Sequence, residues 1–190
     1  MKNLSNQLKM RSNHGILSTS LFACMVFLLF STGAIAQTSK VYIKLTDQAG
    51  MQIKGECTTK GFERWIEALT INSGGKNNTE LSFTMNITGS SAALKKAMGS
   101  SETLLNGLVS VQTINSSTGI PTAAYTITME KISVVACAES MGCNSVMTTS
   151  VMLRSARIGW TYYQASRSGT MTVSNKYGWD AETNAAWSAF

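Results

Sequence analysis

The sequence predicts a mainly β fold, a small antiparallel β-barrel with one short α-helix docked on it. The first observation is a long proline-free stretch, residues 151–163, rich in residues that favour strands. Val151 and Leu153 share one face, whereas the next apolar residues occupy even positions from Ala156 to Tyr162. Strand side chains alternate between faces, so this change of parity with one core requires a β-bulge or a sharp bend.

A second long strand, residues 122–135, shows the same change of parity. Its apolar residues occupy odd positions up to Met129 and even positions from Ile132, so the change falls between them. If the two strands form a hairpin around a loop at residues 137–147, both changes fall at the same height. Neighbouring strands that bend at one level turn a corner of a barrel.

Shorter segments complete the predicted sheet. Residues 62–71 fit helical and strand periods equally well, but their β-branched end and the following Asn72-Ser-Gly-Gly favour a strand from about Trp65. Residues 51–57, after a turn at residues 47–50, fit either the start of a strand or an extended loop. In chain order the shorter predicted strands are residues 40–46, about 65–71, 81–87 and 107–114.

One helix is predicted, at residues 90–99. Ser90 or Ser91 can cap its N-terminus, and Gly99 can end it. Its apolar face consists of Ala93, Leu94, Ala97 and Met98. A helix of this length is unstable alone, so we expect it to dock on the sheet.

The N-terminus has the layout of a secretory signal peptide at residues 1–36. Basic residues precede an apolar run, and Ala34 and Ala36 provide small residues for cleavage before Gln37. The alternatives are a retained membrane anchor and a lipoprotein attached through Cys24. The predicted mature domain is residues 37–190. We expect it to be exported to the periplasm or the exterior of a bacterium, with no stable membrane insertion after cleavage.

The composition argues against several function classes. Removing the predicted signal lowers the net charge from +6 to +3, and the remaining cations are scattered, so nucleic-acid binding is not expected. The only histidine, His14, leaves with the signal, so no histidine-based catalysis or metal site is expected. Glu63 and Glu67 share a strand parity and could pair as in glycosidases, but a solvated face is the simpler interpretation. The sequence therefore predicts neither an enzyme nor a cofactor.

Two residue types leave alternatives open. Cys137 and Cys143 could form a disulfide across a short loop in an oxidising compartment, or stay unpaired thiols. Cys57 is expected to be a small buried hydrophobe. The four tryptophans could form a sugar-binding platform. It is simpler to place Trp65 and Trp160 in the core and to let Trp179 and Trp187 hold the tail or contact a neighbouring subunit.

Several segments, taken in order, carry a family likeness. They are Tyr42-Ile-Lys-Leu45, Ile53-Lys-Gly-Glu56, Trp65-Ile-Glu-Ala-Leu69, Leu81-Ser-Phe-Thr84 with Ser91-Ala-Ala-Leu94, residues 125–133, residues 151–162, and Tyr177-Gly-Trp-Asp180 followed by Asn184. Together they resemble the haemolysin-coregulated protein (Hcp) family, the tube subunits of bacterial type VI secretion. The resemblance implies a small β-barrel with one docked helix, rings of six that stack into a tube, and a lumen that holds effector proteins. It implies no catalytic residue.

Two features depart from that family. Its tube subunits do not normally carry a signal peptide, and the loop at residues 74–79 is shorter than the extension that often reaches the next ring. Two functions therefore follow from the sequence. One is a hexameric ring or tube subunit with effector proteins and tube-tip or sheath components as partners. The other is a secreted monomeric β-barrel that binds a ligand or partner outside a contractile apparatus.

Overall fold

The computed structural model describes residues 39–74, 79–114, 121–141, 146–166 and 170–190. Every described residue belongs to one compact unit, Gln37–Phe190. The predicted cleavage site at Ala34, Ala36 and Gln37 lies outside the described residues. The signal peptide therefore stays a prediction.

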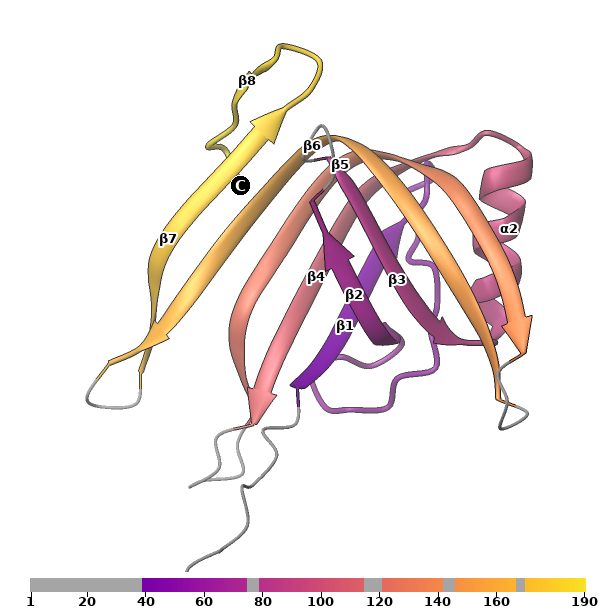
Figure 1. Cartoon of the computed structure of the whole chain (residues 1–190), viewed down its shortest axis with the longest axis horizontal. Helices are drawn as coiled ribbons and strands as arrows, with labels where there is room; N and C mark the ends of the chain where they lie inside the picture. The colour runs from indigo at the N-terminus through magenta and orange to yellow at the C-terminus, as the bar shows by residue number, and fades with distance from the viewer. Residues whose placement is uncertain (1–38, 75–78, 115–120, 142–145, 167–169) are drawn as a thin grey trace, which may run out of the picture. The chain divides into compact units, whose positions relative to one another are not determined.

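The described strands form one antiparallel sheet that closes on itself (Figure 1). The elements, in chain order, are β1 (Ser39–Thr46), β2 (Ile66–Ser73), β3 (Glu80–Asn86), α2 (Gly89–Gly99), β4 (Thr103–Ile114), β5 (Pro121–Met141), β6 (Met147–Ala165), β7 (Met171–Asp180) and β8 (Ala185–Ala186). The strand order is β3-β2-β1-β4-β5-β6-β7-β8, and an additional pairing of β3 with β6 closes the first six strands into a barrel. The predicted barrel with one short helix is confirmed.

Strand β6 is shared between the barrel and an extension outside it. Its first half pairs with β3 up to Arg154, and its second half pairs with β7 from Arg157 onward. Strand β5 pairs with β6 on both sides of this point. Burial on β6 passes from odd positions to Ile158 and Trp160 across the same point, which confirms the predicted change of parity.

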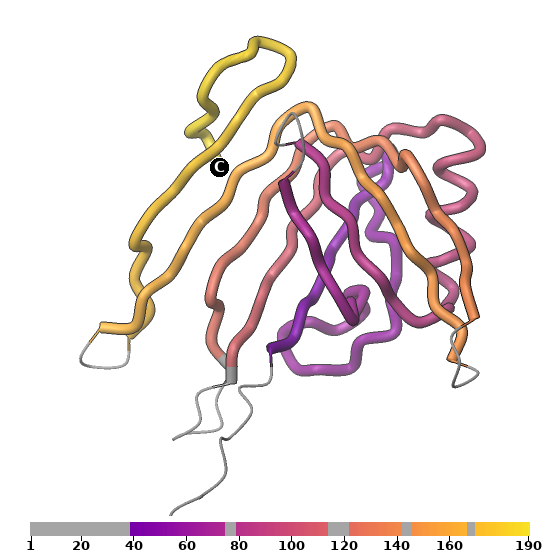
Figure 2. Tube along the Cα trace, in the orientation of Figure 1, coloured from indigo at the N-terminus to yellow at the C-terminus, as the bar shows by residue number. Residues whose placement is uncertain are grey.

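Strand β5 bends at the same level as β6. Glu130 lies opposite Arg157, and Ile132 lies opposite Ser155. Between them Lys131 has a φ of 51°, a left-handed conformation that is uncommon for a residue with a side chain. Both strands arch over the top of the barrel here (Figure 2). The predicted corner in two neighbouring strands is confirmed.

The barrel interior is filled by apolar side chains from every strand of the closed sheet. Ile43, Leu81, Leu104, Ile127 and Leu153 are fully buried, and they come from five of the six strands. Ile66 supplies the sixth, at 2% exposure. Side chains alternate between the two faces of each strand, and the inward-facing side chains of all six strands meet in one core.

Residues 51–57 form an extended loop rather than a strand. The connection between β1 and β2 also covers one side of β1. Tyr42 alternates with the core residues Val41 and Ile43, yet only 2% of its surface is exposed. Phe62 stacks on its ring with a centroid distance of 4.2 Å. Trp65 was expected in the core, but it precedes β2, is only partly buried and lies edge-on to Phe62.

Helix α2 docks on the barrel through the predicted face. Leu94 and Ala97 are buried in the core, and Ala93 and Met98 pack against it. The helix neighbours the part of β5 beyond the corner, where Lys95 forms an ion pair with Glu139 at 2.6 Å. The predicted docking is confirmed.

The start of the helix differs from the prediction. The N-cap is Thr88 rather than Ser90 or Ser91. Ser91 occupies the third helical position, where its hydroxyl accepts a hydrogen bond from the Thr88 N–H at 3.2 Å. This is the reciprocal arrangement of a capping box. The Ser91 hydroxyl also contacts the Thr149 hydroxyl at 2.9 Å, which ties the helix to β6.

The predicted loop at residues 137–147 is wrong in extent. Strand β5 continues to Met141 and β6 begins at Met147, and these two residues are the last cross-strand pair of the hairpin. The small and polar residues of this segment show no apolar alternation, so the sequence pattern did not reveal the strand. Strand β4 likewise begins earlier than predicted, at Thr103.

Replacing Leu153 tests the closed core. Leu153 is fully buried on β6 between β3 and β5, so Leu153→Ala should lower the free energy of unfolding by about 2–5 kcal/mol through lost burial and a cavity. The neighbouring Met152→Ala, on the opposite face and 37% exposed, is the control and should change it by about 0.5 kcal/mol or less. Urea unfolding of both variants measures this, and equal losses would contradict the assigned faces.

Candidate functional site

The part of the molecule outside the closed barrel is a C-terminal extension. We define the C-terminal extension as residues 157–190, which include the second half of β6, β7, β8 and the tail that follows. Most of β7 is exposed, and β8 pairs with β7 at only two positions, Trp179 and Asp180. The extension therefore depends on its own contacts to keep its shape.

A slot on one face of the extension holds the end of the tail. Gly159 and Gly178 lie directly opposite each other on β6 and β7. A Cβ atom at Gly159 would lie 2.6 Å from ring carbons of Phe190, and one at Gly178 would lie 2.3 Å from the carbonyl oxygen of Trp187. Because real Cβ contacts do not come this close, only glycine at both positions leaves room for the tail.

Three further contacts hold the tail in this slot. The Trp187 N–H donates to the Gly178 carbonyl at 3.0 Å, and the Trp187 ring packs on Phe190 at 4.8 Å. The Lys176 ammonium lies 4.8 Å from the centre of the Phe190 ring and donates to the main-chain oxygen of Phe190. Trp187 is buried, which confirms the prediction that it holds the tail.

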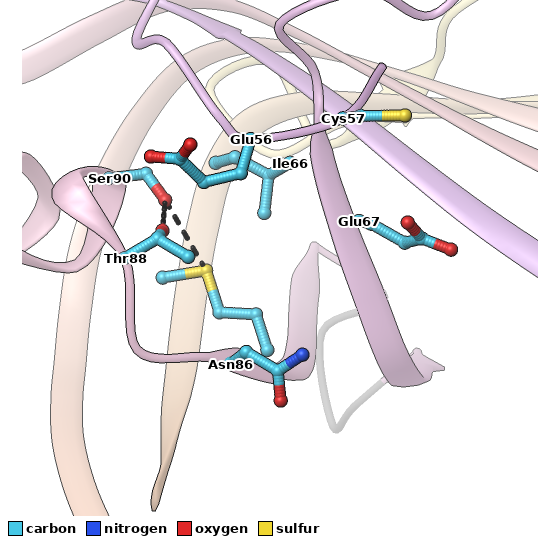
Figure 3. Close-up of a pocket in the computed structure, with 8 residues that line it drawn as sticks. Glu56, Cys57, Ile66, Glu67, Asn86, Thr88 and Ser90 are labelled. Atoms are coloured by element: carbon cyan, nitrogen blue, oxygen red, sulfur yellow. Dashed lines mark hydrogen bonds between the residues drawn. The ribbon is translucent and has the colours of Figure 1, made fainter. Parts of the chain in front are cut away.

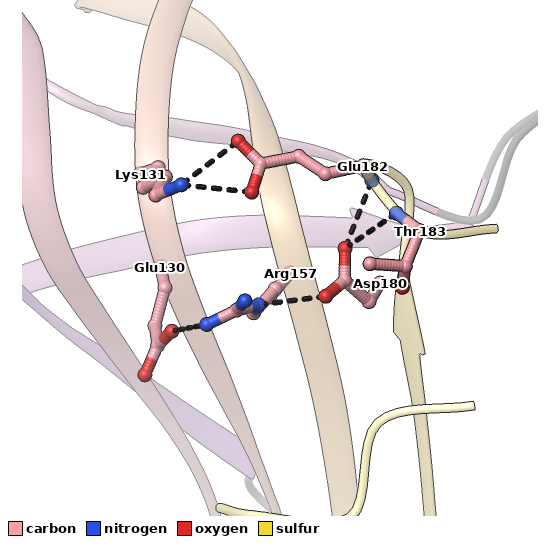
Figure 4. A network of polar contacts seen from close by, with 6 residues as sticks. All are labelled: Glu130, Lys131, Arg157, Asp180, Glu182 and Thr183. Carbon is pink, nitrogen blue, oxygen red and sulfur yellow. Dashed lines mark hydrogen bonds and ion pairs between the residues drawn. The ribbon is translucent and has the colours of Figure 1, made fainter. Parts of the chain in front are cut away.

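An ion-pair network fastens the base of the extension to the barrel corner (Figure 4). Arg157 donates to Asp180 at 2.9 Å and to Glu130 at 3.1 Å, so one guanidinium links β5, β6 and β7. Lys131, the residue at the bend in β5, donates to both carboxylate oxygens of Glu182 at 2.9 and 2.7 Å. The network therefore connects the corner of the barrel with the end of β7 and the turn that follows it.

Asp180 receives the most hydrogen bonds in this network. One carboxylate oxygen accepts from Arg157, and the other accepts from the N–H groups of Glu182 and Thr183 at 2.8 and 3.2 Å. The hydrogen bond from Arg157 is the largest cause that lowers the pKa of Asp180 below its ordinary value, and the two backbone N–H groups add to it. The same contact raises the pKa of Arg157.

The opposite face of the extension carries an aromatic ladder. Trp160 stacks on Tyr177 with a centroid distance of 5.7 Å, and Tyr125 packs on Tyr162 at 5.6 Å. Trp160 is buried, as predicted, but Tyr162 and Tyr177 are 44% and 48% exposed. Val173 on β7 is also exposed. Half-exposed aromatic residues on a rigid sheet are typical of protein–protein contact surfaces.

A second surface, the neutral face, covers four strands of the barrel. It consists of the outward residues of β2, β3, β6 and β5, namely Thr70, Asn72, Ser82, Thr84, Ser150, Met152, Ala138 and Ala136. These residues form two cross-strand rows, one through Thr84 and Ser150 and one through Ser82 and Met152. They line a groove of about 310 Å³ that contains no charged side chain.

A smaller hollow of about 100 Å³ lies beside the start of α2 (Figure 3). Glu56, Cys57 and Glu67 line it, but the two carboxylates point away from each other (Figure 3). Glu67 is engaged by Lys40 at 3.3 Å. Across the described ranges, no group of three or more His, Cys, Asp and Glu side chains is placed to hold a metal ion. The hollow brings together no recognisable catalytic set.

Comparisons with known proteins agree with this architecture. A family profile described as "Type VI secretion system effector, Hcp" matches residues 42–162, which is more than half of the chain. The chain belongs to the Hcp family. No curated protein sequence matches it. The family match ends at β6, so β7, β8 and the tail of this Hcp chain lie beyond it.

Solved Hcp structures share the fold at low sequence identity. Hcp1 from Salmonella typhimurium has a TM-score of 0.63 and 19% identity over 78% of this chain and 99% of its own. A structure titled as a type six secretion system protein has a TM-score of 0.65 and 19% identity over 79% and 100%. Secreted protein Hcp3 from Pseudomonas aeruginosa has a TM-score of 0.58 and 18% identity over 73% and 98%.

The structure gives the positions of most of the cysteine and glutamate residues that were considered as site residues from the sequence. Cys137 is buried on β5 opposite Val151, whereas Cys143 lies outside the described residues, so their disulfide stays a prediction. Cys57 is buried, as predicted. Glu63 lies in a turn before β2 and accepts a hydrogen bond from the Gly61 N–H, so the interpretation as two carboxylates on one strand is wrong.

The sequence did not reveal the tail slot of this Hcp chain. Gly159, inside the predicted strand 151–163, was the available signal, since glycine in a strand often marks a close approach of another segment. Gly178 gave no such signal, because no strand was predicted around it. In the part of the chain that the structure describes, no helix is long and apolar enough to cross a membrane. The candidate functional surfaces in the described part of the chain are the C-terminal extension and the neutral face.

Filling the slot should displace the tail. Gly159→Ala introduces a Cβ where the Phe190 ring lies, so it should lower the free energy of unfolding by about 1–3 kcal/mol. In a Phe190→Ala background, Gly159→Ala should lower the free energy of unfolding much less, because the ring that its Cβ would meet has been removed. Urea unfolding of the two single variants and the double variant measures the difference, and fully additive losses would contradict the contact.

The Asp180 network should make stability depend on pH in acid. Because the pKa of Asp180 is lower in the folded state, its contribution is present above the ordinary pKa of 3.8 and is lost as the pH falls below it. Asp180→Asn should therefore have a lower free energy of unfolding than the unmodified chain at pH 7, and the difference between the two should become smaller below pH 3.8. Urea unfolding between pH 7 and pH 3 measures this difference, and a constant difference would contradict the assigned cause.

Proposed function

We propose that this Hcp chain is a structural, non-enzymatic subunit that assembles with copies of itself into rings of six, as tube subunits of type VI secretion do. The observation that carries the proposal is the neutral face. Its two rows, which cross four adjacent strands, present only uncharged side chains to the exterior, one of them a methionine. A surface of this kind suits the wall of a passage, because a protein cargo can lie against it without forming strong ion pairs.

The surroundings of the neutral face support this role. Charged side chains lie at its margin, where Arg154 pairs with Glu80 at 2.8 Å, rather than within the two rows. The eight outward residues of the two rows include no Asp, Glu, Lys or Arg. We propose that effector proteins are the cargo that contacts this face.

The C-terminal extension supports assembly in a second way. Its ladder residues Tyr162 and Tyr177 are half-exposed and present aromatic surface outside the barrel. Such residues become fully buried when a neighbouring subunit covers them. Tube-tip or sheath components are further partners that the family resemblance implies.

The available side chains support the non-enzymatic role that we propose. The single histidine of the chain is His14, within the predicted signal peptide. At the surface of the barrel, Glu67 pairs with Lys40, Glu80 pairs with Arg154, and Glu63 accepts a hydrogen bond from the Gly61 N–H. We therefore assign no catalytic residue and no cofactor.

The mass of the purified protein in solution tests ring formation. Light scattering of protein from cells that express the full chain should give six times the mass of one subunit. The aromatic ladder would be partly buried in that assembly, whereas the neutral face would line its passage. A single-subunit mass over a wide concentration range would instead support a secreted monomeric barrel that binds a partner.

We also propose that the chain is exported and cleaved after Ala36, and that Cys137 and Cys143 are joined in the exported form. N-terminal sequencing of exported protein should begin at Gln37, and the intact mass should rise by two hydrogen atoms on reduction. Cys143→Ser should abolish that rise, whereas Cys57→Ser should leave it. A retained N-terminus or an unchanged mass would contradict the respective proposal.

A further inference from the structure

We propose that the end of the β5–β6 hairpin beside α2 is a binding site for the soft monovalent cation Cu(I), with the thioether sulfurs of Met141 and Met147 as its ligands. We call these two residues the methionine pair. The hairpin ends where β5 stops and β6 starts, at the lower right of Figure 1. The site goes beyond the proposed ring and does not depend on ring formation.

The strand register brings the two methionines together. Met141 ends β5, Met147 begins β6, and the two lie directly opposite each other. Opposite residues of an antiparallel pair share a face and have Cβ atoms about 4.5–5.5 Å apart. Methionine is long, unbranched and flexible, so two sulfur atoms can approach one ion from two strands. Among the register pairs of the described strands, this is the one position where methionine lies opposite methionine.

Both side chains of the methionine pair are open to solvent. Met141 is 67% exposed and Met147 is 48% exposed. The methionines that fill the core behave differently, since Met85 and Met129 are almost completely buried. Packing inside the barrel therefore explains those two residues but not the methionine pair, whose sulfur atoms are accessible to an ion.

The groups around the methionine pair favour a soft ion. Glu139 lies on the same face, two residues before Met141, but its carboxylate pairs with the Lys95 ammonium at 2.6 Å. The hydroxyls of Ser140 and Thr148 lie on the opposite face and contact each other at 3.1 Å. Thioether sulfur selects Cu(I), whereas Mg²⁺, Ca²⁺ and Mn²⁺ prefer oxygen ligands. The pair thus offers sulfur ligands beside a carboxylate that already has a cation.

The backbone holds one of the two ligands from both sides. Met147 pairs with Met141 on β5, and its carbonyl accepts a hydrogen bond from the Ile87 N–H at 3.4 Å. The next residue, Thr148, pairs with Asn86 on β3. A ligand on a fixed backbone loses less freedom when it binds an ion, so more of the interaction free energy appears as affinity.

Methyl resonances of methionine test the site directly. Protein from cells that express the full chain is labelled with ¹³C at the methionine methyl groups and titrated with Ag(I). This ion has the charge and filled d shell of Cu(I) and needs no reductant. The Met141 and Met147 resonances, identified by their absence from the Met141→Leu and Met147→Leu spectra, should shift together and saturate at the same Ag(I) concentration.

Replacing either methionine should weaken binding to the other. Leucine keeps the apolar character and approximate volume, so both variants should stay folded, which urea unfolding measures. Loss of one ligand should lower the affinity by about tenfold or more. Competition with a chromogenic chelator under reducing conditions should show the same fall for Cu(I). Met152→Leu is the matched control, because Met152 is 37% exposed on β6 but lies opposite Ala136, and this variant should keep the affinity.

Two outcomes of the titration would overturn the site. One is a shift of the Met141 and Met147 resonances no larger than that of Met152, and the other is an unchanged affinity in both leucine variants. Because Cys143 lies between the two methionines in the sequence, the titration is repeated with Cys143→Ser. Retained paired shifts support the methionine pair, whereas their loss would assign the ion to the thiol and overturn it. None of these readouts depends on the mass of the assembly.

Discussion

The pairing of β6 with two different partners determines the shape of this molecule. In its first half β6 closes the barrel by pairing with β3, and in its second half it supports β7. A single strand serves both purposes because β5 and β6 bend together at Lys131 and Ser155. Arg157, just after the bend, then fixes the extension through Glu130 and Asp180. Barrel closure and the position of the extension are thus coupled through one corner.

The corner could be predicted from the sequence because large apolar residues lie on both sides of it and change parity there. In both long strands the parity change separates bulky side chains, such as Met129 from Ile132, so it can be read without a structure. The β-bulges at Leu69 of β2 and Val135 of β5, where the pairing with the neighbouring strand shifts, were not predicted. Val135 is followed by Ala136, Cys137 and Ala138. Such small residues occur on buried and exposed faces alike, so their order does not show which face is buried. Small residues on both faces therefore hide a bulge.

The surfaces were harder to predict than the core. The neutral face depends on which residues of four strands share a row, and that requires the register of three pairings. The tail slot requires Gly159 and Gly178 to lie opposite each other, which again depends on register. Tyr42 alternates with the core residues of β1, so its place in the strand indicates an outward side chain. Phe62, from the connection that follows β1, covers its ring and buries it. Local sequence pattern contains none of this information.

The tail slot links three positions that are far apart in the sequence. Phe190 occupies the space that side chains at residues 159 and 178 would need, and its ring is covered by Lys176. A relative that loses the aromatic residue no longer needs either glycine, and a relative that acquires a side chain at either glycine has no room for the ring. Across homologous chains we expect these positions to covary, as a joint presence of two glycines and an aromatic tail or a joint absence of all three.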